Sequence, residues 1–143
     1  MTNLPVTADV QFLPGKGKLY IDALMDPSGN PLTVLDIDQG FTFSGRIELP
    51  GWLSGKGVVR LSADEIGGPL DKTVGQQLLT ITGANTVNDP PSITYPWSIR
   101  VKSPTLPDDS RMYQFGIVFV FQTPAGGHTD IGGFYDLGAF LVV

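Results

Sequence analysis

The stretch YQFGIVFVFQ, from Tyr113 to Gln122, says more about the fold than any other part of the chain. Every second residue in it is aromatic or aliphatic, and this set is Tyr113, Phe115, Ile117, Phe119 and Phe121. Successive side chains of a β-strand point to opposite faces, so the set predicts one buried face of a strand. Val118 and Val120 stand among the alternate residues. Because the strand is apolar on both sides at its centre, we expect it in the middle of a sheet.

The same period of two recurs along the chain and predicts eight or nine strands. The clearest lies at 41–49, and the residues expected on its inner face are Phe41, Phe43, Gly45, Ile47 and Leu49. The other strands are expected at 6–12, 19–24, 32–37, 59–64, 78–82, 95–102 and 134–143. Clusters drawn from 18 Gly and 12 Pro residues separate them as turns. The best helix candidate, 70–79, is interrupted by Gly75, so we expect one helical turn there at most.

This pattern predicts an all-β fold in one domain over residues 1–143. We expect a two-sheet antiparallel β-sandwich of the jelly-roll or immunoglobulin-like kind. A closed β-barrel is the alternative, since it also has one apolar inner face. We favour the sandwich because the long segments 83–93 and 103–111 suit crossings between sheets better than the tight turns of an up-and-down barrel.

The charge content narrows the classes of partner. Only 16% of the residues are charged, where about 25% is usual. Either Thr, Ser, Asn and Gln cover the outer faces of the strands, or another chain covers part of the surface. The net charge is −5 and Lys and Arg form no cluster, so nucleic acid is not an expected partner.

The location follows from two further features. No stretch approaches the ~20 apolar residues of a membrane span, and residues 1–5 lack the basic and apolar regions of a signal peptide. We therefore expect a soluble, acidic protein that is cytoplasmic or exported without a signal peptide. The absence of cysteine excludes disulfides, thiol catalysis and Cys-ligated zinc.

No residues with the pattern of a catalytic site stand out, so we expect no enzyme activity and no cofactor. The only histidine, His128, lies in a glycine-rich turn, and the chain has no Gly-x-Ser-x-Gly motif. Asp36 and Asp38 begin the fragment Asp-x-Asp-x-Gly of a calcium loop. The position that needs a bidentate Glu is Ile47, so these two are weak metal candidates. The other interpretation is a turn in which Asp side chains hold backbone N–H groups.

The candidate binding residues are Trp52, Tyr135, Phe140 and Val142. Trp52 follows Pro50-Gly51, where an aromatic side chain closes the core, contacts a protein or contacts a ligand. Trp97 belongs to an inward set and is expected in the core. The last strand reaches Val143, and an uncharged edge strand can extend a neighbour's sheet.

These features favour a non-catalytic structural or protein-interaction module within a larger or homo-oligomeric assembly. The expected partner is a protein or a second copy. The alternative is a lectin-like, carbohydrate-binding module that uses aromatic loop residues, with or without calcium. A third hypothesis is an enzyme on a sandwich scaffold, but the sequence indicates no candidate nucleophile for it.

Overall fold

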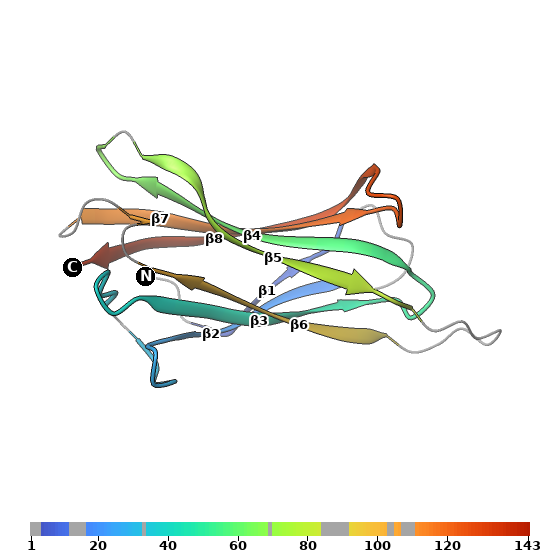
Figure 1. Cartoon of the computed structure of the whole chain (residues 1–143), viewed down its shortest axis with the longest axis horizontal. Helices are drawn as coiled ribbons and strands as arrows, with labels where there is room; N and C mark the ends of the chain where they lie inside the picture. The colour runs from blue at the N-terminus through green and yellow to red at the C-terminus, as the bar shows by residue number, and fades with distance from the viewer. Residues whose placement is uncertain are drawn as a thin grey trace.

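A computed structural model describes residues 4–11, 17–32, 34–68, 70–83, 92–102, 105–106 and 111–143. These residues form eight strands and no helix (Figure 1). The strands are β1 (Val6–Asp9), β2 (Lys18–Met25), β3 (Phe41–Leu49), β4 (Gly55–Glu65), β5 (Asp71–Ile81), β6 (Ile93–Val101), β7 (Arg111–Gln122) and β8 (His128–Val142). Within this part of the chain, no helix is long and apolar enough to cross a membrane.

The strands form two antiparallel four-stranded sheets packed face to face, as Figure 1 shows. Sheet 1 has the order β1-β2-β3-β6 and sheet 2 has the order β5-β4-β7-β8. The predicted sandwich is therefore confirmed, and β7 lies in the middle of its sheet as expected. The long segments predicted to cross between the sheets lie mostly outside the described residues. The strands that they join, β5, β6 and β7, do alternate between sheets.

The alternative of a closed barrel is not what the structure shows, because single bonds rather than ladders join the sheet edges. On one side, the Gln11 N–H donates to the Gly132 carbonyl at 2.7 Å. On the other side, the Ser98 N–H donates to the Gln77 side-chain carbonyl at 2.6 Å. Over the described residues, the two sheets therefore approach each other at both edges without a continuous hydrogen-bonded closure.

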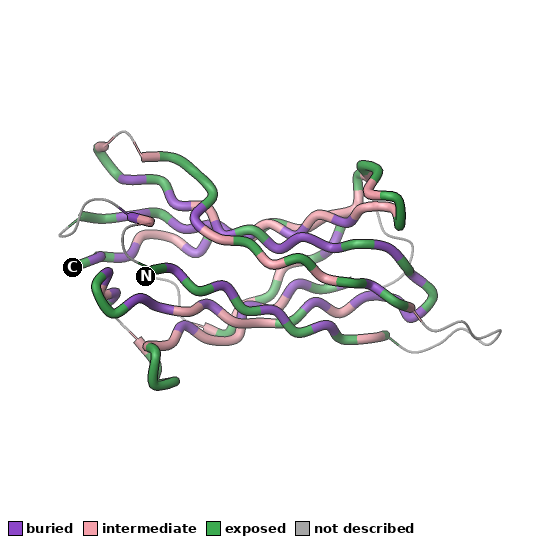
Figure 2. The backbone as a smooth tube through the Cα atoms, viewed as in Figure 1, coloured by how far each residue is buried: buried purple, intermediate pink, exposed green. Residues whose placement is uncertain are grey.

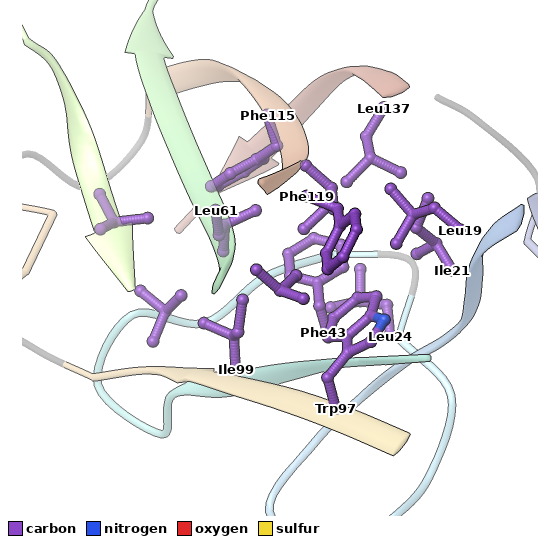
Figure 3. Close-up of a cluster of buried hydrophobic side chains, with 14 of the residues drawn as sticks. Leu19, Ile21, Leu24, Phe43, Leu61, Trp97, Ile99, Phe115, Phe119 and Leu137 are labelled. Atoms are coloured by element: carbon purple, nitrogen blue, oxygen red, sulfur yellow. The ribbon is translucent and has the colours of Figure 1, made fainter. Parts of the chain in front are cut away.

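The core lies between the sheets and is rich in aromatic rings. Burial alternates along the strands in Figure 2, and Figure 3 shows side chains from both sheets meeting. All five inward residues predicted for β7 are buried, with exposed fractions of 4% or less. Phe115 contacts four other rings, and their centroids lie 5.6–6.4 Å from its own: Phe41, Phe43, Tyr113 and Phe140. Trp97 is 2% exposed, which confirms its predicted place in the core.

The helical turn considered for 70–79 is wrong, because this segment belongs to the edge strand β5. Gly75, which interrupted the helical pattern, lies where β6 comes close. A Cβ added there would collide with the Ile99 side chain. The glycine therefore marks a close approach between two sheet edges.

The strand predicted at 32–37 is also wrong. Pro31 and Leu35 make only isolated bridges, and the described residues near them form turns. Leu35 bridges Val142 in parallel, and the Val143 N–H donates to the Leu35 carbonyl at 2.8 Å. This segment therefore lies against the outer edge of β8 near its end.

A period of two over 19–24 predicts that Leu19, Ile21 and Ala23 share the inner face of β2, but the alternation breaks after Ile21. The register with β3 shifts between Ile21 and Ala23, so Leu24 is buried in place of Ala23. Gly45 is the β3 partner of Ile21, and a Cβ on it would collide with the Tyr20 carbonyl and the Trp97 ring. A bulge thus changes the phase of a strand in a way that simple alternation cannot anticipate.

Candidate interaction face

The outer faces of the two sheets differ in chemistry. On sheet 1, β2 and β3 carry mainly polar outward residues, and Arg46 lies 3.4 Å from the Asp22 carboxylate and 4.1 Å from the centre of the Tyr20 ring. On sheet 2, the outward residues include exposed or half-buried Val, Leu, Ile, Met and Phe side chains. The outer face of sheet 1 is therefore covered by charged and hydroxyl side chains, whereas that of sheet 2 exposes apolar ones.

Four exposed apolar residues form a continuous row across one end of the outer face of sheet 2. Met112 on β7 is the cross-strand partner of Leu141 on β8, and the Ile66 N–H donates to the Met112 carbonyl at 2.9 Å. On the far side of β8, the Leu35–Val142 bridge places Val34 next to Leu141. We call this set the distal row; its exposed fractions are Ile66 49%, Met112 40%, Leu141 42% and Val34 46%. Val143, 43% exposed, continues it along β8.

A second apolar row crosses the same face further along the strands. Val58 on β4 is paired with Leu78 on β5 and with Val120 on β7. We call these three residues the proximal row. Leu78 is 69% exposed, whereas Val58 is buried between its neighbours. Phe134 on β8, 59% exposed, is paired with Val118 next to this row.

Polar and charged residues separate the two rows. On β4, Arg60 lies next to the proximal row and Asp64 lies next to the distal row. Asp64 is paired with Asp71 of β5. The Gln114 amide donates to the Asp136 carboxylate at 2.7 Å, which links β7 to β8 between the rows. The face thus combines apolar area at both ends with opposite charges in the middle.

A buried carboxylate, that of Glu65, lies directly beside the distal row, on the residue before Ile66. The Glu65 side chain is 2% exposed, and its Oε1 lies 3.8 Å from Nε of Arg111. Its Oε2 has no hydrogen-bond partner among the described residues. A Cβ on Gly68 would collide with this carboxyl group, so a larger residue there would displace the Glu65 side chain. Since the Glu65 N–H donates to the Leu70 carbonyl at 2.8 Å, the residue holds the turn that places Ile66 beside Met112.

The residues predicted from sequence fall into two groups. Phe140 and Val142 are 2% and 0% exposed, so their side chains lie in the core and offer no surface to a partner. The outward side chain between them on β8 is Leu141, and a binding role for Phe140 and Val142 through the backbone edge of the strand stays a prediction. Trp52 is 46% exposed and does not close the core. The neighbouring Leu53 is buried there instead. Tyr135 is half-buried against the core, and a binding role for it or for Trp52 stays a prediction.

The two aspartates considered for calcium form a turn. The Asp38 N–H donates to the Asp36 carboxylate at 2.9 Å, and the Gly40 N–H donates to the Asp36 carbonyl at 3.0 Å. Over the described ranges, no three His, Asp or Glu residues gather where they could hold a metal ion. His128 is exposed at the start of β8 and is paired with Gln122.

A shallow groove of about 550 Å³ lies where β1 meets β7 and β8. Its floor contains Gly132 and Gly133, and a Cβ on Gly133 would lie 3.1 Å from the Asp9 carbonyl. Other lining residues include Asp9, Gln11, Asp130 and Phe134. The groove therefore offers carboxylates beside an exposed ring, and its volume is within the range of small-ligand sites.

Fold and face together define an all-β sandwich with one polar and one partly apolar outer sheet. Comparison of the chain with known proteins finds no matching family model, no matching curated protein and no matching solved structure.

The distal row was not identified from the sequence, because alternation within single strands indicates only one of its four residues. Leu141 belongs to the outward set of β8, and this could have been found by alternation from Phe140. Met112 precedes the regular run that begins at Tyr113, and Ile66 follows the end of β4. Val34 joins the row only through the Leu35–Val142 bridge, a contact between segments far apart in sequence.

Proposed function

We propose that the chain is a non-catalytic protein-interaction module that works as a subunit of an assembly. Its contact surface is the outer face of sheet 2. The observation that carries this proposal is the distal row, in which four apolar side chains that are each 40–49% exposed lie side by side. Single exposed apolar residues are ordinary on a protein surface, but contiguous ones are typical of surfaces that another molecule covers.

The low charge content supports the same conclusion. Interface centres are depleted in charged residues and enriched in Met and aromatic side chains. Met112 and Phe134 lie on this face, and its charged residues Arg60, Asp64 and Asp136 lie between the apolar rows, with Lys56 beyond the proximal row. The outer face of sheet 1 has no comparable apolar row among the residues that the structure describes.

Carbohydrate binding remains the second candidate, and the groove between β1 and β8 favours it. Sugar rings stack on exposed aromatic side chains and are bound by carboxylate and amide groups, which Phe134, Asp9 and Gln11 would supply. We prefer the interaction module because the apolar area extends well beyond this groove, to the opposite end of the sheet.

The proposal predicts that the native mass of the assembly depends on the distal row. In cells that produce the chain, we expect it to occur in a complex heavier than its own 15.3 kDa. The double substitution Met112→Ser and Leu141→Ser should weaken that complex by about tenfold or more, because it removes two adjacent apolar contacts, and a loss of about 1.4 kcal/mol between them corresponds to a tenfold change in affinity. Size-exclusion chromatography of gentle lysates, with detection of the chain, measures this.

Trp52→Ala provides the matched control, because Trp52 is equally exposed but lies outside the face. It should leave the native mass unchanged. A chain that elutes as a free monomer in the wild type would contradict the proposal. So would a complex that resists the double substitution and dissociates with Trp52→Ala.

A further inference from the structure

We infer that the partner is a second copy of this chain, stacked face to face on sheet 2 about a two-fold axis. The axis lies between the two copies and crosses the strands at the Ser62–Gly116 pair, where the Ser62 hydroxyl lies 3.4 Å from the Gly116 carbonyl. The inference rests on the proposed function and adds the identity and the geometry of the partner.

The spacing of the apolar rows carries this step. On β7, Val120 and Met112 lie four residues on either side of Gly116, and on β4, Val58 and Ile66 lie four residues on either side of Ser62. Four residues of strand span about 13 Å. A half-turn about the axis reverses the strand direction and keeps each strand over its own counterpart, so it places Val58 over Ile66 and Val120 over Met112 of the other copy. Apolar side chains of β4 and β7 then cover one another at both ends of the face.

Charge is arranged with the same symmetry. Arg60 and Asp64 lie two residues on either side of Ser62 on β4, and both are exposed. The half-turn therefore brings Arg60 of each copy opposite Asp64 of the other, which forms two equivalent ion pairs. A self-complementary patch of this kind is what a two-fold interface requires. The net charge of −5 does not prevent the contact, because this part of the face carries both signs.

Side-chain size also agrees with the stacking. Phe134 and Ala139 on β8 pair with Val118 and Gln114, so they too lie on opposite sides of the central pair. The half-turn places the exposed Phe134 ring of one copy over the small Ala139 of the other. A hollow of about 190 Å³ beside Gly116 and Phe134 leaves further room at this point.

The face is large enough for such a dimer. Four strands about 4.8 Å apart, over the length of β4, give a flat area of roughly 650 Å² per copy, near the ~800 Å² of a standard interface.

Asp136 is paired with Gly116, so it is a charged group that the axis leaves beside its own symmetry mate. Its carboxylate accepts hydrogen bonds from the Gln114 amide at 2.7 Å and from the Gly138 N–H at 2.9 Å. These hydrogen bonds stabilise the negative charge of each carboxylate, but the Asp136 carboxylates of the two copies still repel each other. Removal of this charge should therefore tighten the dimer, whereas removal of Arg60 or Asp64 should weaken it.

Charge exchange tests the geometry. The proteins to compare by sedimentation equilibrium over a wide concentration range are the purified wild type, Arg60→Asp, Asp64→Arg and an equimolar mixture of the two variants. We expect the wild type to dimerise and each variant alone to dimerise about tenfold more weakly or worse, because like charges then face each other. In the mixture, the new aspartate faces the new arginine and the unchanged Asp64 faces the unchanged Arg60. The mixture should therefore recover a heterodimer of nearly wild-type affinity.

The outcomes separate this inference from the proposed function. Three results would each overturn the two-fold stacking. In the first, the mixture dimerises no more tightly than each variant alone. In the second, the variants dimerise as tightly as the wild type, and in the third, the wild type stays monomeric. If the wild type is monomeric when purified but the cellular complex still depends on Met112 and Leu141, the interaction face stands with a different partner. Asp136→Asn should raise the dimer affinity, and a fall would also count against the axis.

Discussion

Replacement of Phe115 with alanine is expected to lower the free energy of unfolding by about 3–5 kcal/mol, the usual cost of deleting a buried phenylalanine. Phe115 is fully buried and contacts rings from β3, β7 and β8. Its removal therefore leaves a cavity between the sheets where Phe41, Phe43 and Phe140 meet. Urea unfolding measures the loss, and the fluorescence of the buried Trp97 reports the opening of the core.

Gln114→Ala is the matched control on the same strand. Gln114 is exposed and donates a surface hydrogen bond to Asp136, so its loss should cost no more than about 1 kcal/mol. If the two substitutions have equal effects, the inner and outer faces of β7 are wrongly assigned.

Removal of the last four residues, Phe140 to Val143, is expected to abolish stable folding. The truncation deletes two side chains that are 2% and 0% exposed, and it removes the bridge that ties Leu35 to β8. Two buried apolar side chains contribute about 2–5 kcal/mol each, which approaches the total stability of about 5–15 kcal/mol of an ordinary domain. Near-ultraviolet circular dichroism should therefore lose the signals of packed aromatic residues.

A shorter truncation distinguishes the core role of this segment from an edge role. Removal of Val143 alone takes away an exposed side chain and its hydrogen bonds with Leu35 and Ile37, so a folded chain with a modest loss of stability is expected. A folded, cooperatively melting monomer after removal of all four residues would instead mean that the end of β8 is dispensable.

Alternation within single strands was sufficient to predict the sandwich and most of its core. The inward residues of β3, β6 and β7 could be identified because the inner face of each of these strands is apolar along its whole length. Alternation failed in β2, where a bulge after Ile21 changes the phase. It also failed at 70–79, because the reason for Gly75 lies in the neighbouring β6, which local sequence does not contain.

The candidate face was predictable only in part. The low charge content left two explanations open, polar outer faces or a surface covered by another chain, and Val118 and Val120 were recognised as outward residues. Which apolar residues share a row depends on the register between strands and on the Leu35–Val142 bridge. Register is set by the whole fold, so the distal row and its symmetry with the proximal row could be found only in three dimensions.

Hydroxyl-radical footprinting tests most directly whether the outer face of sheet 2 is covered by protein. The reactivities of Met112, Phe134 and Trp52 should be compared between the dilute purified chain and the native assembly. We predict that Met112 and Phe134 become several-fold less reactive in the assembly, while Trp52, exposed elsewhere, does not change. Unchanged reactivity at Met112 and Phe134, with or without protection of Trp52, would contradict the account.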